Sequence, residues 1–169
     1  MTMASRIGVM NAGKLAQVAN PRELYEAPRS RWIAEFVGDI NLFDGEFKLR
    51  DGHRLVIATS DAGTLVAAEP REPIGEAKLS VAIRPEKVKL SRRGPVSEAG
   101  HETAINRLDG VVADICYLGG TTTYRVKLDS GGMVQAAVAN TARLDVDAYS
   151  VDQHVVAWFT PDDCVVLER

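Results

Sequence analysis

Hydrophobic and polar positions follow two different periods along the chain. Before Gly38 the apolar residues fall at helical spacing behind a short hairpin pattern, and after Gly38 they alternate with polar residues as in strands. This change predicts a small mixed segment at residues 1–38, followed by a β-rich domain at residues 39–169.

A glycine-containing stretch near the N-terminus has the outline of a phosphate-binding loop. Gly8–Leu15 matches G-x-x-x-x-G-K-[ST] except at its last position, where Leu15 has no hydroxyl to bind Mg²⁺. A phosphate loop must also lead into a helix, whose N-terminal amides receive the phosphates. Here Lys14–Val18 alternates like a strand and is expected to pair with Arg6–Met10 across a tight turn. The sequence therefore predicts a hairpin, and no nucleotide site, at this place.

Two short helices are expected after the hairpin. Asn20 is suited to cap the first helix, with Pro21 at its first position, and Ser30 is suited to cap a second helix that ends at Gly38. The residues that we expect to dock on the β-rich domain or on a second copy of the chain are Trp32, Ile33 and Phe36.

Short strand patterns separated by turn residues fill the second segment. We expect strands at 43–49, with Leu49 on the face of Phe43, and at 54–57, 79–83, 88–90, 110–118, 121–128, 133–138, 155–159 and 164–167. Residues 91–106 show little periodicity and are predicted to form a loop. Many short strands at this spacing favour a small barrel or sandwich, because closing the sheet removes its exposed edges.

Composition narrows the classes of function. The chain of 169 residues has 20 basic and 23 acidic residues, a net charge of −3, and 6% aromatic residues. This balance argues against a nucleic-acid-binding OB-fold, which would have a basic groove with interleaved aromatic residues. There is no apolar run long enough to cross a bilayer and no signal-peptide pattern, so we expect a cytoplasmic protein.

Cysteine and histidine residues do not form a metal-binding pattern. His53, His101 and His154 lie far apart in the sequence, so no metal site is expected. Cys116 and Cys164 each lie in an apolar strand pattern, and both are predicted to be reduced core residues.

Several blocks, in order and spacing, resemble the end of the ATPase domain and the TOBE domain of ATP-binding subunits of ABC importers. The blocks are Arg6–Leu15, Pro21–Tyr25, Trp32–Phe43, Ala82–Glu86 and Tyr117–Tyr124. The segment Gly38–Phe43 is most similar to that of spermidine/putrescine importers, while sugar, iron and thiamine importers share much of the rest. The resemblance implies a mainly β fold: an OB-like TOBE barrel preceded by the hairpin and the two helices.

The resemblance also implies a function without catalysis in this chain. The family's phosphate loop, signature motif, acidic Mg²⁺ strand, catalytic glutamate and switch histidine have no counterpart here, so Met1 is expected to lie inside a longer protein. We therefore expect no enzyme activity and no cofactor, although the longer parent would bind ATP and Mg²⁺. The resemblance implies a regulatory homodimer that joins the rest of the ATPase and the membrane subunits at the inner face of the cell membrane. A sensor that binds the transported polyamine, sugar, iron or thiamine is the alternative.

Two loops contain the strongest candidates for a binding site. Arg84 and Glu86 flank a proline that keeps the chain before it extended, so both could face a ligand or a subunit, or hold a strand end as a structural ion pair. The loop with Tyr117, Gly119 and Thr121 could bind a ligand at the mouth of a barrel, or be a plain hairpin with a bulge.

A polyamine site would need separated carboxylates and aromatic faces for the ammonium groups. The residues of suitable type are Glu86, Asp114, Tyr117, Trp158 and Asp162. The sequence alone does not place them together, and an acidic chain contains many such sets.

Overall fold

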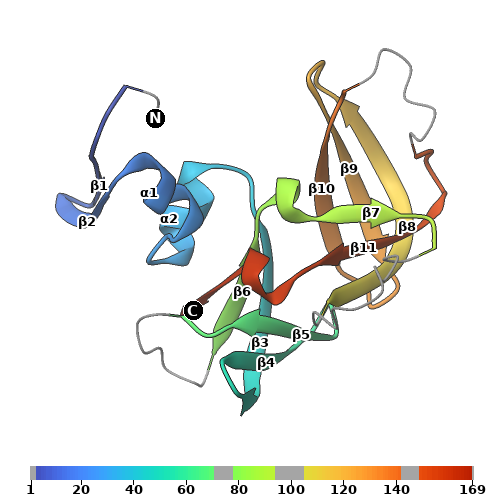
Figure 1. Cartoon of the computed structure of the whole chain (residues 1–169), viewed down its shortest axis with the longest axis horizontal. Coiled ribbons are helices and arrows are strands. Elements are labelled where there is room, and N and C mark those ends of the chain that lie inside the picture. The colour runs from blue at the N-terminus through green and yellow to red at the C-terminus, as the bar shows by residue number, and fades with distance from the viewer. Residues whose placement is uncertain (1–2, 71–77, 94–104, 142–148, 169) are drawn as a thin grey trace.

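A computed structural model describes residues 3–70, 78–93, 105–141 and 149–168. The elements follow the change of period in the sequence, since a hairpin and two helices precede two five-stranded sheets. Along the long axis of the molecule the hairpin and helices lie at one end, one sheet lies in the middle and the other sheet lies at the far end (Figure 1).

The predicted hairpin is confirmed. Strands β1 (Ile7–Asn11) and β2 (Lys14–Ala19) pair antiparallel. The two residues between them, Ala12 and Gly13, have positive φ angles of 47° and 76°, which suits the right-handed twist of a two-residue hairpin. Lys14 therefore begins a strand, and no helix follows the glycine.

The helix starts are also confirmed. Helices α1 (Pro21–Glu26) and α2 (Arg31–Val37) are capped by Asn20 and Ser30, whose side chains accept hydrogen bonds of 2.9 and 3.3 Å from the main-chain N–H three residues later. Gly38 follows α2, as expected.

Contact of Trp32, Ile33 and Phe36 with the sheets was predicted wrongly, and their docking on a second copy of the chain stays a prediction. Ile33 is buried, but it packs with residues of the hairpin and of α1 and not with the sheets. Trp32 and Phe36 are 37% and 67% exposed, and their rings stack on each other with centroids 5.3 Å apart. The residue of α2 that packs against the neighbouring sheet is Ala34, because a small side chain lets the helix approach closely.

The two sheets are wholly antiparallel. The middle sheet has the order β12-β6-β3-β4-β5, with bounds β3 (Asn41–Asp51), β4 (Arg54–Thr59), β5 (Thr64–Ala68), β6 (Leu79–Ile83) and β12 (Cys164–Glu168). The far sheet has the order β10-β9-β8-β11-β7, with bounds β7 (Lys89–Ser91), β8 (Asn106–Tyr117), β9 (Thr121–Leu128), β10 (Met133–Ala139) and β11 (His154–Phe159). One hydrophobic core draws on both sheets, and its largest fully buried side chains include Phe43 and Phe159.

Both sheets are built on the same plan. In each, a long strand pairs on one side with a two-strand meander, and on the other side with a strand that leads into a 3₁₀ turn. The turns are Pro85–Lys87 and Pro161–Asp163, and the strand after each turn joins the opposite sheet. The two long strands even begin alike, with Asn-Leu-Phe-Asp-Gly from Asn41 and Asn-Arg-Leu-Asp-Gly from Asn106. The β-rich part is therefore a duplicated unit with exchanged last strands.

Two buried asparagines join the sheets at equivalent places. Asn41 of β3 donates to the carbonyl of Gln135 in β10 at 2.9 Å and accepts from its N–H at 2.7 Å. Asn106 of β8 makes the same pair of bonds with Val66 of β5, both at 2.7 Å. Each amide thus continues the ladder from one sheet to the edge strand of the other.

Bulges near the middle of both long strands change which residues face the core. In β3 the register shifts between Phe47 and Leu49, so Leu49 leaves the core face and is 51% exposed. In β8 the shift after Val112 turns Ile115 inward and Cys116 outward, and Cys116 is exposed. The predictions that placed Leu49 with Phe43 and Cys116 in the core are therefore wrong.

Most of the remaining strand predictions agree with the structure. The strand β5 was not anticipated, and β8 begins four residues earlier than expected. Cys164 is buried, as predicted, and burial raises the pKa of its thiol. Residues 94–104, the centre of the predicted loop, lie outside the described residues. Within the described part of the chain, none of the helices combines the length and the apolar character that a membrane span requires.

Candidate functional site

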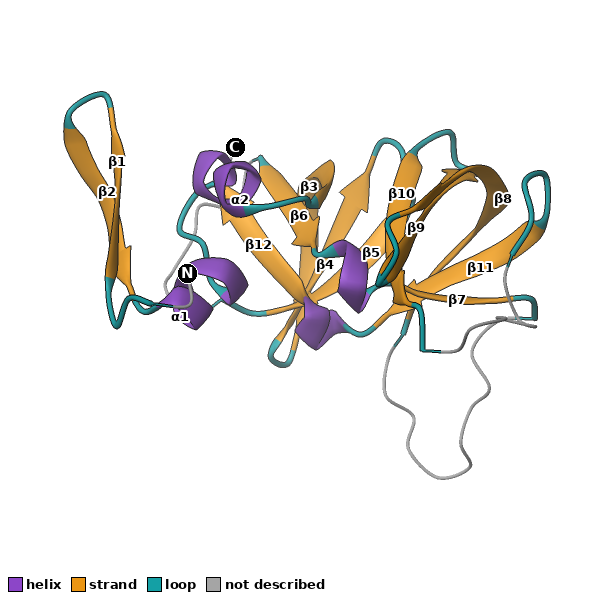
Figure 2. Cartoon of the chain, turned by 90° about the horizontal axis from the view of Figure 1, so that it is seen from above, coloured by secondary structure: helices purple, strands orange, loops and turns teal. Residues whose placement is uncertain are grey.

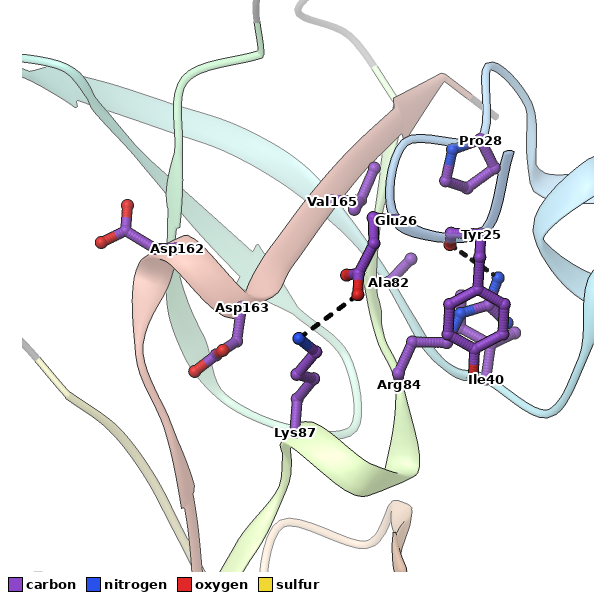
Figure 3. Close-up of a pocket in the computed structure, with 10 residues that line it drawn as sticks. All are labelled: Tyr25, Glu26, Pro28, Ile40, Ala82, Arg84, Lys87, Asp162, Asp163 and Val165. Atoms are coloured by element: carbon purple, nitrogen blue, oxygen red, sulfur yellow. Dashed lines mark hydrogen bonds and ion pairs between the residues drawn. The ribbon is translucent and has the colours of Figure 1, made fainter. Parts of the chain in front are cut away.

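The most elaborate polar arrangement lies where the helices meet the middle sheet, around Arg84. This residue follows the last residue of β6, in extended conformation, and its side chain is 5% exposed. The extended backbone directs the side chain away from the core of the sheets and toward α1 and α2, as Figure 3 shows for its approach to Tyr25.

Among the described residues, the Arg84 guanidinium binds main-chain carbonyl groups and no carboxylate. Nη1 donates to the carbonyl oxygens of Ala34, Gly38 and Asp39 at 3.0–3.1 Å, and Nη2 donates to that of Tyr25 at 3.0 Å. These carbonyls lie at the C-terminal part of α2, in the following linker, and in α1. A cation that binds the carbonyls of a helix C-terminus satisfies acceptors that the helix itself leaves open.

Tyr25 connects Arg84 with Glu86. The guanidinium carbon of Arg84 lies 4.0 Å from the centre of the Tyr25 ring, and the Tyr25 hydroxyl donates to Glu86 Oε1 at 2.8 Å. Burial, followed by the hydrogen bond to Glu86, raises the pKa of Tyr25 to about 12. Arg84 and Glu86 thus both contact Tyr25 of α1, and Pro85–Lys87 forms a 3₁₀ turn.

The other end of α2 is also tied to the middle sheet. Arg31 Nη1 donates to both carboxylate oxygens of Asp44 in β3 at 2.8 and 3.1 Å, and Ser80 of β6 donates to Asp44 Oδ1 at 2.6 Å. The hydrogen bond to Asp44 raises the pKa of Arg31. The helix is therefore held at its first residue by its own arginine and at its C-terminus by an arginine of the sheet.

A small cavity lies beside this joint (Figure 3). It has a volume of about 40 Å³ and is lined by residues of α1, β6 and both 3₁₀ turns, among them Glu26, Arg84, Lys87, Asp162 and Asp163. Such a volume accommodates a few water molecules but no polyamine. Lys87 Nζ lies 3.5 Å from Glu26 Oε1, so a cationic side chain of the protein already stands among these carboxylates.

The loop with Tyr117, Gly119 and Thr121 forms a closed hairpin turn at the tip of β8 and β9. The N–H of Leu118 donates to the Thr121 carbonyl at 2.8 Å, and the side chain of Asn140, just after β10, donates to the Gly119 carbonyl at 2.6 Å. Tyr117 is 72% exposed. The loop is held by its own bonds, and the large apolar side chains at its tip face solvent.

The candidate polyamine residues are spread over several elements. Glu86 and Asp162 lie on different 3₁₀ turns, while Asp114 lies opposite Arg125 on the far sheet and points to the other face from Tyr117. Trp158 of β11 has the ammonium of Lys89 4.6 Å from its ring, so a cation of the chain occupies that face. Among the described residues no group of three or more His, Cys, Asp or Glu side chains is placed to bind a metal ion.

Sequence reasoning did not identify Tyr25, Arg31, Asp44, Asn41 and Asn106 as important polar residues. For the two asparagines a signal was present, namely the repeated Asn-x-apolar-Asp-Gly pattern at the start of both long strands. The partners of Tyr25 and Arg31 are distant in sequence, and their positions depend on how α2 packs.

Two curled antiparallel sheets around one core, with exchanged last strands, define an OB-like all-β module. The sequence matches the TOBE domain family over residues 81–167. Because this match covers more than half of the chain, the chain belongs to the TOBE domain family.

Curated relatives extend the similarity over the whole chain. It is 35% identical over 168 residues to the putrescine transport ATP-binding protein PotG of Escherichia coli K12, which covers 99% of this chain and 43% of that protein. The spermidine/putrescine import ATP-binding proteins PotA of Trichormus variabilis and Rubrobacter xylanophilus are 32% and 39% identical over 100% and 80% of this chain, and over 42% and 34% of their own lengths. The chain thus spans less than half the length of these relatives.

A solved structure confirms the fold. The cytoplasmic molybdate-binding protein ModG, with molybdate bound, superimposes with a TM-score of 0.61 at 16% identity, covering 75% of this chain and 94% of that one. The predicted mainly β, OB-like fold is confirmed by this likeness and by the sheets themselves.

Proposed function

We propose that this chain is the regulatory and dimerisation part of an ATP-binding subunit of an ABC importer for polyamines. The observation that carries the proposal is the similarity over the whole chain to ATP-binding proteins of putrescine and spermidine import, combined with the TOBE match. In the proposed role the chain acts at the inner face of the membrane, through contacts with the remainder of the subunit and with the membrane subunits.

The proposal assigns no catalysis to the chain. Lys14, which stands where a phosphate loop would have its lysine, begins β2 and is exposed, and the nearest helix starts only after Asn20. A nucleotide phosphate would therefore find no helix N-terminus beside it. We expect no ATP hydrolysis by the purified 169-residue chain, and turnover that persists after removal of contaminating ATPases would contradict this.

Dimerisation is proposed through the β-rich part. The exposed apolar side chains at the tip of β8 and β9, Tyr117 and Leu118, are suited to such a contact, since exposed apolar patches commonly mark association sites. Light scattering on the chain over a range up to tens of micromolar should show a dimer. Leu118 and Met10 are 67% and 62% exposed but lie on different parts of the molecule. Leu118→Ser should therefore weaken the dimer and Met10→Ser, the matched control, should not.

Ligand binding is tested separately by calorimetry with putrescine and spermidine, and with a sugar, ferric citrate and thiamine as comparison ligands. Heat from the polyamines alone would support a sensor within the proposed importer. Binding of another ligand would change the substrate that is assigned to the importer. If none of the ligands binds, dimerisation remains as the regulatory role. A strict monomer that binds none of these compounds would contradict the proposal.

A further inference from the structure

We propose that Arg84 is a positioning residue that couples the β-rich part to the N-terminal helices, so that both move as one rigid body. The coupling itself follows from the contacts of this chain. The proposed function is needed only for the regulatory use of this coupling, in which a movement of the barrel is transmitted to the rest of the longer subunit.

The helix α2 is the element that is coupled. Its apolar contact with the middle sheet is small, since it consists of Ala34 against Ala82 and Leu167 with a few partly buried neighbours. Polar contacts flank this apolar contact at both ends of the helix. Arg31 binds Asp44 at the start of the helix, and Arg84 binds three carbonyls at its end. A contact of so few apolar atoms needs the polar bonds to hold the helix in one orientation.

The duplicated unit shows that the barrel does not need an arginine at this position. In the second copy the residue before the 3₁₀ turn is Thr160, whose N–H and hydroxyl donate to Asp163 at 2.9 and 2.7 Å within the same turn. The chain passes from β11 through this turn into β12 just as it passes from β6 into β7. Arg84 is therefore needed to hold the helices, and the strand connection of the barrel forms without it.

The hairpin follows α1 and α2 in the same body. The buried side chain of Gln17 in β2 donates to the Ala27 carbonyl at 3.2 Å and accepts from the Arg29 N–H at 3.0 Å, between the two helices. Val9 of β1 shares a buried cluster with Ile33 of α2. Figure 2 shows the hairpin standing at the end of the molecule, joined to the rest through the helices. A displacement of the barrel is passed on to the hairpin through Arg84 and α2.

The two tryptophans of the chain provide a separate reporter for each side of the joint. Trp32 lies on α2 and Trp158 lies on β11. Unfolding in urea is followed by fluorescence in Trp158→Phe, which retains Trp32, and in Trp32→Phe, which retains Trp158. With Arg84 present, the two transitions should coincide, as expected of one cooperative unit.

The test is Arg84→Thr in both backgrounds, because threonine is the residue that the second copy of the unit has in this place. The Trp32 midpoint should then fall below the Trp158 midpoint by about 1 M urea or more. Amide hydrogens of α1 and α2 should exchange at least about tenfold faster, while those of β8 and β9 keep their protection. Arg107→Thr, which removes an exposed pair with Asp109 inside one strand, is the matched control and should leave the transitions coincident.

Three outcomes would overturn the proposal: transitions that are already separate with Arg84 present, transitions that still coincide in Arg84→Thr, and equal loss of protection in the helices and the barrel. None of these readouts requires a dimer, a ligand or a nucleotide, provided that all variants are compared at one protein concentration. A failed coupling test therefore does not contradict the proposed function. Likewise, a chain that stays monomeric and binds no ligand does not contradict the coupling.

Discussion

Replacing Asn106 by alanine should remove the main polar link between β8 of the far sheet and β5 of the middle sheet. The Asn106 side chain is 4% exposed, and both of its hydrogen bonds, with the N–H and the carbonyl of Val66, measure 2.7 Å. No other strand of the described chain pairs with that edge of β5. The substitution therefore leaves two main-chain groups without partners.

The size of the effect follows from these two groups. An unpaired buried polar group costs about 1–3 kcal/mol, and the cost of the two groups together lies below the maximum because Val66 is only partly buried. We expect the free energy of unfolding to fall by about 2–4 kcal/mol, a large part of the stability of a domain of this size. Urea denaturation followed by circular dichroism measures it directly.

Controls separate the amide bonds from the loss of volume. Asn41→Ala removes the equivalent link to Gln135 and should cost a similar amount, whereas Ser130→Ala, whose bond to the Asp61 carbonyl is exposed, should cost less than about 1 kcal/mol. Asn106→Asp keeps the shape but places a carboxyl oxygen against the Val66 carbonyl. This arrangement raises the pKa of the new carboxyl, so the variant should be more stable at pH 5 than at pH 8. A loss below about 0.5 kcal/mol for Asn106→Ala would refute the reasoning.

Three further changes test other parts of the structure. A Cβ on Gly45 would lie 2.6 Å from the Ala58 carbonyl oxygen, so Gly45→Ala should lower the free energy of unfolding by about 1–3 kcal/mol in urea denaturation, and an unchanged value would contradict the close strand approach. A thiol reagent should modify Cys116 rapidly and Cys164 only after unfolding, so labelling of both in the native protein would contradict the burial of the second. The pKa of Tyr25 is raised to about 12, so its phenol stays protonated in the folded chain while the unfolded chain titrates near pH 10. Its contribution to stability is present below pH 10 and lost as the pH rises toward 12, so the decline over that range should be smaller in Tyr25→Phe, and equal declines would contradict the assignment.

The elements themselves could be predicted because their signals are local. The caps at Asn20 and Ser30, the hairpin turn before Lys14 and the alternating strands all depend on neighbours within a few residues, and all appear in the structure. The bulges could not be predicted, because an extra residue in one strand is defined only by its pairing with the neighbouring strand. This is why the burial of Leu49 and Cys116 was predicted wrongly.

In the candidate site, too, local signals were predictable and long-range contacts were not. The sequence singled out Arg84 and Glu86 from the fixed geometry around their proline, and the structure gives both a part in one polar arrangement. Their partner Tyr25 is about sixty residues away along the chain, and the carbonyls that Arg84 binds become available only when α2 packs on the sheet through Ala34.

The sequence by itself determined the kinds of elements and their order, because hydrophobic period, caps and turn residues act over short distances. Its motifs also indicated the TOBE domain family. Tertiary structure alone decided that the β-rich part is one unit used twice with exchanged strands. It also decided that Asn41 and Asn106 join the sheets, and that an arginine of the barrel holds the helices. The physical reason is that hydrogen bonds and burial depend on which surfaces meet, and these surfaces come from segments far apart in the chain.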